Sequence, residues 1–253
     1  NGENMQARGE MLRAIDHDSG NTESYGGTTY ILSASLASTD ITDRTRPNGQ
    51  VNGWAGLRVP YEYVSEYFDV SGQDYETGSY QVTDKRGSMF FIKGRKESME
   101  GALYSFMNGW SCLKFNNIPY GQTDQSYLPV SAVKAFSDVD FPMIRLAEVY
   151  LIYAEACMNL GEGATAIPKI AELSQRAGVA PPAEITADFL VAERARELMW
   201  EGHRRTDLIR FGLYDSAEYL WPYKGGDLFA GQAFPSYKLI FPIPPTELAA
   251  NDL

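Results

Sequence analysis

The stretch ERARELMWEGHRRTDLIRFG (residues 193–212) combines dense charge of both signs with large apolar side chains. Nine of its twenty residues are charged, whereas charged residues make up 22% of the whole chain. Such a stretch is either an acid/base or anion-binding cluster, or an ion-pair network on two helices separated at Gly202. An anion site needs an excess of positive charge, and here the two signs nearly balance. We therefore favour an ion-pair network that holds packed helices together.

The segment before this stretch predicts a helical hairpin. FPMIRLAEVYLIYAEACMNLG (141–161) predicts a helix that Pro142 opens and Gly161 ends. Apolar residues lie on both of its sides, which indicates burial over most of its surface. Residues 164–178 predict a second helix, and together the two have the size of one tetratricopeptide-like unit.

Capping residues mark the ends of the later helices. Pro168 is tolerated because it falls in the first turn of the second helix, and Gly178 stops that helix. Residues 180–202 predict a third helix, with Thr186 as its N-cap and Gly202 at its end.

Residues 1–140 are rich in Gly, Ser, Thr, Asn and Tyr and predict short strands between long loops. Pro60 opens one expected helix at 60–69, where apolar residues recur at helical spacing. The strands are expected at 9–15, 87–94 and 111–115, the loops at 19–27, 46–53 and 70–79, and an extended segment broken by prolines at 229–248. The expected fold is mainly α with irregular loop-rich regions. We expect one domain over 1–253, with a loop-rich part (1–140), a helical core (141–212) and an extended tail (213–253).

Composition excludes several classes of function. The net charge of −11 argues against binding nucleic acid or an anionic lipid surface. Zinc-type spacing is absent, and no stretch of 18 apolar residues could span a bilayer. Cys112 and Cys157 could pair in an oxidising compartment, but Cys157 fits better as a small buried apolar residue.

An acidic turn at 16–23 (DHDSGNTE) raises the question of a calcium site. Asp16, Asp18 and Glu23 offer oxygen ligands, but the required sixth-position glycine is Asn21. We favour an ordinary acidic turn, and expect no metal and no cofactor.

The order of motifs resembles the C-terminal part of the SusD/RagB family of outer-membrane nutrient-binding lipoproteins. The resemblance rests on FPMIRLAEVYLIYAEACMNLG, on RAG (176–178), on the stretch at 193–212 and on the late LIFPIPPTEL, and covers roughly residues 140–253. RVPYEYVSEYFD (58–69) and DKR (84–86) fit the expected order more weakly. The departures are Ala171 and Ser174, where the family often has an Asn and an additional Arg, and the missing lipobox and closing motif. We expect roughly half of a typical member, including its lipid anchor, to lie upstream.

The resemblance implies a non-enzymatic surface glycan-binding protein that passes oligosaccharide to a TonB-dependent outer-membrane transporter of the SusC type. It also implies an architectural role for the charged motif, whose expected members are Arg145, Glu148, Glu155, Glu193, Arg194, Glu197, Glu201, Arg204 and Asp207.

Glycan recognition needs flat aromatic faces for sugar rings and polar groups for their hydroxyls. We expect both on loops within 21–58, where Asn21 is one available polar side chain and the candidates are Tyr25, Tyr30, Asp40, Asn52, Trp54 and Arg58. Trp54, which lies between Gly53 and Gly56, comes just before the stretch at 58–69 that resembles the family. It is either a wall of a sugar platform or a loop anchor packed into the core.

Two other classes of function remain open. Glycoside hydrolysis needs only two carboxylates about 5–10 Å apart, and 33 acidic residues are available. A protein-interaction scaffold built on helical repeats would use the hairpin at 141–178, although a single unit is thin support.

Overall fold

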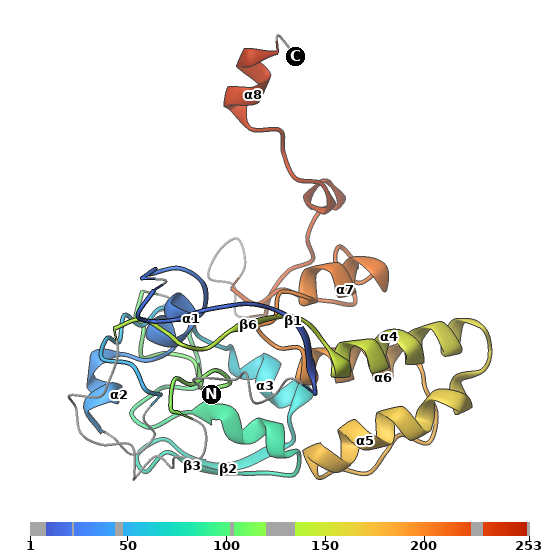
Figure 1. Cartoon of the computed structure of the whole chain (residues 1–253), viewed down its shortest axis with the longest axis horizontal. Coiled ribbons are helices and arrows are strands. Elements are labelled where there is room, and N and C mark those ends of the chain that lie inside the picture. Colours follow the sequence, from blue (N-terminus) through green and yellow to red (C-terminus); the bar gives the residue numbers. More distant parts are fainter. Residues whose placement is uncertain are drawn as a thin grey trace.

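The computed structural model describes residues 9–21, 23–43, 48–101, 104–119, 135–223 and 230–251. Its α-helices are α1 (Gly27–Ser35), α2 (Ser38–Asp43), α3 (Tyr61–Tyr67), α4 (Leu146–Asn159), α5 (Ile167–Ala177), α6 (Ala187–Glu197), α7 (Arg204–Arg210) and α8 (Pro245–Ala250). Its strands form antiparallel pairs: β1 (Met11–Ile15) with β6 (Phe141–Arg145), β2 (Val70–Asp74) with β3 (Ser79–Val82), and β4 (Phe90–Phe91) with β5 (Ser111–Cys112). In Figure 1, α4, α5 and α6 gather at one end of the body, and α1 and α2 lie at the other.

The caps of α5 and α6 confirm the predicted helix signals. Pro168 lies in the first turn of α5, and Gly178 ends that helix with φ 75°. Thr186 caps α6 by accepting a hydrogen bond from the backbone N–H of Phe189. Helix α4 packs against both α5 and α6. The likeness of the α4–α5 pair to a tetratricopeptide unit stays a prediction.

The helix predicted from residue 141 begins five residues later than expected. Residues Phe141–Arg145 form β6, which pairs with β1 so that Ile15 faces Phe141 and Met11 faces Arg145. The N–H of Leu146 then donates to the carbonyl of Glu10 as α4 begins. Pairing with a segment about 130 residues earlier therefore overrides the local helical pattern.

The third helix ends at Glu197 instead of Gly202. Lys114 Nζ lies 2.9 Å from the backbone carbonyl of Glu197 and 2.8 Å from that of Met199, and Arg145 also donates to the Glu197 carbonyl. Backbone carbonyls that accept hydrogen bonds from these side chains do not accept the backbone hydrogen bonds that would continue the helix. The chain turns there, with Trp200 at φ 61°.

Helix α4 is less buried than its apolar residues predict. Ala147, Leu151 and Ala154 face α5 and α6 and are buried. Ile152 and Tyr153, in contrast, are exposed, because the packing neighbours of α4 cover only one of its sides.

The first half of the chain is more regular than its composition predicts. The expected loop at 70–79 is a hairpin, in which β2 and β3 flank a turn held by the carboxylate of Asp74. The expected strands at 87–94 and 111–115 shorten to β4 and β5, and a 3-10 helix covers Lys85–Met89. Two short helices, α1 and α2, replace part of the expected loop region.

Helix α6 is shared by the two larger apolar clusters. Ala195 joins a cluster that contains Phe90 and Trp110, whereas Leu190 joins the cluster of α4 and α5. Cys112 and Cys157 are buried free thiols, one in each cluster. The charged residues of α6 must therefore find partners inside the protein.

The C-terminal segment after residue 230 leaves the body as an arm (Figure 1). It is extended as predicted, apart from a 3-10 turn at Ser236–Leu239 and the helix α8. Arg205 holds it by donating to the carbonyls of Lys238 and Leu239. No helix in the described ranges is long and apolar enough to cross a membrane.

Candidate functional site

Three of the aromatic residues singled out in the sequence meet at the surface. Tyr25 precedes α1, Tyr30 lies within it, and Trp54 lies on the segment before α3. The ring centroid of Trp54 is 5.8 Å from that of Tyr25 and 6.4 Å from that of Tyr30. Trp54 is 38% exposed, Tyr25 is 63% exposed and Tyr30 is 48% exposed. We call these three residues the aromatic cluster.

The backbone beside Trp54 is fixed against the end of α1. The N–H of Trp54 donates to the carbonyl of Ser33 over 2.8 Å, and Trp54 forms a bridge with Ala37. A Cβ on Gly53 would lie 2.4 Å from the carbonyl carbon of Ala37, so only glycine permits this close approach. The exposed ring is thus carried on an ordered backbone.

Phe136 is a member of this surface that the sequence analysis missed. Its ring centroid lies 5.0 Å from that of Tyr25. It follows residues 120–134, which lie outside the described ranges. No short-range signal links it to Tyr25, because more than a hundred residues separate the two.

Asp40 is a correction to the expected ligand-binding set. It lies on α2 and is buried, where it forms an ion pair with Arg95 and accepts a hydrogen bond from the N–H of Ala37. Its burial and these two contacts, both made by Oδ2, disfavour a direct role in binding sugar hydroxyls. Tyr30 is a correction of placement only, because it projects from a helix and not from a loop.

The other two polar candidates, Arg58 and Asn52, differ in their hydrogen bonding and position. Arg58 uses its Nη1 to donate to the carbonyls of Ser105 and Asn108, over 2.8 and 3.0 Å. Asn52 is half-buried and lies two residues before Trp54. Asn52 therefore stays the polar candidate nearest to the aromatic cluster along the chain.

The acidic residues of the opening charged stretch lie inside the protein. The two carboxylates of Glu193 and Glu197 share Arg86, whose Nη1 lies 2.7 Å from Glu193 Oε1 and 2.9 Å from Glu197 Oε2. Arg86 also pairs with Asp84 at 2.6 Å. Arg145 continues the chain of contacts, because it lies 2.6 Å from both Glu197 and Glu201.

Further cations close this assembly. Lys114 pairs with Glu201, and Arg176 pairs with Glu197 and, at 2.8 Å, with Glu10. We call the assembly the buried charge network, and its members are Glu10, Asp84, Arg86, Lys114, Arg145, Arg176, Glu193, Arg196, Glu197 and Glu201.

Arg194 and Asp207 form a separate buried pair that joins α6 to α7. Arg194 Nε lies 2.8 Å from Asp207 Oδ1, but its N–H does not form a hydrogen bond with this oxygen. The contact is therefore an ion pair between two residues that are almost fully buried.

Three other expected motif residues, Glu148, Glu155 and Arg204, also lie outside the buried charge network. Glu155 pairs with Arg210 at 2.6 Å, and Glu148 lies 3.4 Å from the imidazole of His203. Arg204 is a correction, because its guanidinium donates to the hydroxyl of Tyr67 at 2.6 Å and to a backbone carbonyl instead of to a carboxylate.

Sequence reasoning did not assign the members Glu10 and Asp84, nor three cations outside the opening charged stretch, Arg86, Lys114 and Arg176. Arg86 belongs to DKR, which fits the family order, so a signal for it existed. Lys114 lies in a short apolar run, with no local charged partner to indicate its role.

The electrostatics of Glu197 follow from this setting. Burial alone raises the pKa of a carboxyl group, but the charges of Arg145, Arg176 and Arg86 outweigh it and lower the pKa of Glu197 to about 2. Glu197 therefore remains ionised in the folded protein far below the ordinary value of 4.5.

Acidification is expected to destabilise the protein between pH 4.5 and about 2, and part of this loss is due to Glu197. The unfolded chain takes up a proton at Glu197 near pH 4.5, whereas the folded chain does so only near pH 2, so the free energy of unfolding falls through this window. The contribution of this group is on the order of 3 kcal/mol. Urea titrations at successive pH values measure it; a Glu197→Gln variant with the parent's acid slope would contradict the assignment.

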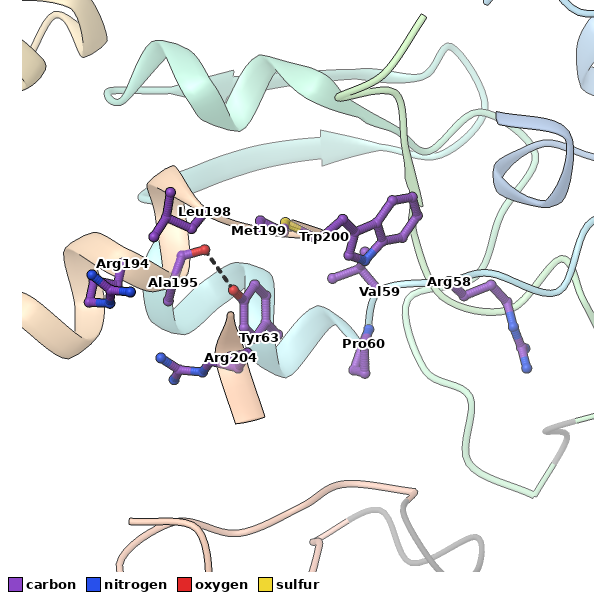
Figure 2. A pocket seen from close by; sticks show the side chains of 10 residues that line it. All are labelled: Arg58, Val59, Pro60, Tyr63, Arg194, Ala195, Leu198, Met199, Trp200 and Arg204. Atoms are coloured by element: carbon purple, nitrogen blue, oxygen red, sulfur yellow. Dashed lines mark hydrogen bonds between the residues drawn. The ribbon is translucent and has the colours of Figure 1, made fainter. Parts of the chain in front are cut away.

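A cavity of about 180 Å³ lies beside the network, between α3 and the turn that follows α6 (Figure 2). Its walls are chiefly apolar, and the hydroxyl of Tyr63 donates to the carbonyl of Ala195 at its edge. Arg194 and Arg204 lie toward one end and Arg58 at the other, so the three cations do not converge (Figure 2). The cavity is smaller than the roughly 300 Å³ at which small-molecule sites usually begin. None of its lining residues carries a carboxylate, so it offers no acid/base pair.

The acidic turn at 16–23 is bound to its own chain. The carboxylate of Asp18 accepts from Gly20 and Asn21, and Ser19 and His17 donate to Asp138 and Asp140. Among the described residues, no group of three or more acidic, His or Cys side chains is arranged to hold a metal ion.

Comparison with known proteins identifies the family. A model of the SusD family matches residues 96–253, which is more than half of the chain. The chain belongs to the SusD family.

The SusD family relatives are longer proteins. Starch-binding protein SusD of Bacteroides thetaiotaomicron is 31% identical over 284 residues, covering 99% of this chain and 49% of the relative. A SusD-like protein of Bacteroides ovatus is 27% identical over 182 residues, covering 69% of this chain and 31% of the relative. The chain thus spans about half the length of the first and less of the second.

Solved structures show the same fold. Surface glycan-binding protein A from Bacteroides thetaiotaomicron, in complex with laminarihexaose, has a TM-score of 0.59 at 21% identity, over 95% of this chain and 50% of that chain. A SusD-like carbohydrate binding protein from Bacteroides vulgatus has a TM-score of 0.56 at 15% identity, over 96% and 48%. These matches confirm the predicted SusD-like fold, which is rich in helices with a few short strands.

Proposed function

We propose that this chain is part of a non-enzymatic, surface-exposed glycan-binding protein, and that Tyr25, Tyr30 and Trp54 form its sugar-binding surface. The observation that carries the proposal is the meeting of three exposed aromatic rings on an ordered backbone. Aromatic faces of this kind stack against the C–H faces of sugar rings, and their hydroxyl and indole N–H groups bind sugar hydroxyls. We expect Asn52, two residues before Trp54, to supply a polar group to this surface.

The relatives support the class of ligand. One curated relative is named as a starch-binding protein, and one structural neighbour was solved with laminarihexaose. Both names refer to glucose polymers, so we extend glucan binding to this chain as the first ligand class to examine.

The family also supports a partner and a location. We propose that the whole protein is held at the outer membrane by an upstream lipid anchor and passes oligosaccharide to a TonB-dependent transporter of the SusC type. The acidic net charge of −11 disfavours direct attraction to an anionic surface, which fits attachment through an anchor.

Isothermal titration of the full-length protein with malto-oligosaccharides and laminari-oligosaccharides is the direct test. We expect saturable binding of at least one series, with heat that disappears when the aromatic cluster is removed. Absence of binding to these and to a wider oligosaccharide panel would remove the proposed function.

A glycoside hydrolase is the second candidate, and one observation bears on it. Burial raises the pKa of Glu62, and the negative charge of Glu97 adds to the effect. A carboxyl group with a raised pKa is a feature of acid catalysts in glycosidases. Chromatography of the titrated oligosaccharides separates the two functions, since cleavage above background that a Glu62→Gln variant abolishes would establish the hydrolase.

A further inference from the structure

A second pair of exposed aromatic side chains lies on the segment 104–108. Tyr104 is 85% exposed and Phe106 is 50% exposed. No other large apolar side chain among the described residues is as exposed as Tyr104. Aromatic rings left in water on an otherwise ordered segment suggest a binding surface, because burying them on a ligand is favourable.

Two arginines hold the backbone of this segment. Arg95, which is 4% exposed, donates from Nη1 to the carbonyl of Phe106 over 3.1 Å. Arg58 donates to the carbonyls of Ser105 and Asn108, and its Cζ lies 5.6 Å from the ring centroid of Phe106. The backbone that carries the aromatic pair, and the ring of Phe106, are therefore held in place, which lowers the entropy lost when a ligand binds.

Arg95 and Arg58 also connect the segment 104–108 to the aromatic cluster. Arg95 pairs with Asp40, whose carboxylate accepts from the N–H of Ala37, and Ala37 forms a bridge with Trp54. Each of these contacts has hydrogen-bond length or the spacing of paired strands, so the backbones of Phe106 and Trp54 lie within about 20 Å of each other. Arg58 gives a second connection, because it follows Trp54 by four residues.

We propose that Tyr104 and Phe106 form a second glycan subsite, which binds sugar units further along the same oligosaccharide that Tyr25, Tyr30 and Trp54 hold. This inference rests on the proposed function and names a longer ligand for it: a chain of pyranose units that reaches from one aromatic surface to the other. A disaccharide occupies only one surface at a time. Asp40 and Arg95 then act as positioning residues that set the distance between the two surfaces.

The experiment compares short and long probes on one double variant. Maltose, maltoheptaose, laminaribiose and laminarihexaose are titrated into the full-length parent protein and into the Tyr104→Ala/Phe106→Ala variant. We expect the variant to bind the longer effective probe about tenfold more weakly, the scale on which aromatic contacts contribute to binding, and to bind the disaccharide as the parent does. Tyr237→Ala, which removes an exposed aromatic from the C-terminal arm, is the matched control and should change neither affinity.

The outcomes separate this inference from the function on which it rests. If Trp54→Ala loses binding while the double variant binds the long probes as the parent does, the second subsite is excluded and the proposed function stands. A separate subsite is also excluded if the double variant binds the disaccharide and the long probe more weakly by the same factor. If the parent binds neither series, the proposed function fails for both glucans and the inference fails with it. The two side chains are exposed, so unchanged thermal unfolding verifies that the variant is folded.

Discussion

Replacing Trp54 with alanine is expected to weaken glycan binding by about 2 kcal/mol or more, roughly thirtyfold. The ring is 38% exposed and forms the centre of the aromatic cluster, between Tyr25 and Tyr30. The backbone N–H that donates to Ser33 is kept in the variant. The free energy of unfolding should therefore fall by much less than the about 3–5 kcal/mol that a buried tryptophan contributes.

Glycan affinity and the free energy of unfolding are both measured on Trp54→Ala. Titration with the oligosaccharide that the parent binds most tightly gives the first, and urea unfolding gives the second. Trp54→Phe is the matched control, because it keeps an aromatic face and should recover part of the affinity. A large loss of stability with unchanged affinity in the folded fraction would make Trp54 a loop anchor and end its assignment as a sugar-binding residue.

Replacing Glu197 with alanine is expected to cost about 3–5 kcal/mol of stability without changing glycan affinity in the folded fraction. Its carboxylate is almost fully buried and is shared by Arg86, Arg145 and Arg176. Removing it leaves these guanidinium groups close together without the charge that offsets their burial. Arg194→Ala belongs to the same class, because it leaves the buried carboxylate of Asp207 with the partly exposed Arg210 in place of its buried partner.

Glu172→Ala is the matched control for this loss. Glu172 also pairs with a cation, Lys169, at 2.8 Å, but both side chains are about half exposed. Exposed ion pairs of this kind contribute little to stability. Equal melting temperatures for Glu197→Ala and the parent would contradict the structural role of the network and reopen a functional one.

The sequence predicted those features whose signal lies within a few residues. Pro168, Gly178 and Thr186 end or begin their helices through local hydrogen bonds and backbone angles, and the structure confirms them. The strand at 141–145 and the early end of α6 were missed, because their partners are β1 and Lys114, far away in the sequence.

The candidate site divides in the same way. The sequence drew attention to Tyr25, Tyr30 and Trp54 because aromatic residues are concentrated there, and the structure brings their rings together. The ion pair between Asp40 and Arg95, and the contact between the rings of Phe136 and Tyr25, could not be predicted from the sequence. Charge and exposure depend on partners in three dimensions, which residue type alone does not specify.

The buried charge network has a consequence for the order of folding. Glu193 and Glu197 meet Arg86 across 107 and 111 residues, and Arg145 meets Glu10 across 135. Closing such long loops costs entropy before any contact repays it, and contacts of large sequence separation slow the search for the native state. Glu193 also pairs with Arg196 of the same helix, but Glu197 is paired with Arg86, Arg145 and Arg176 from other segments, so α6 buries this carboxylate favourably when those cations arrive. Docking of α6 is therefore a late step in folding that follows the assembly of the rest of the body, and its amide protons should be protected only in the fully folded molecule.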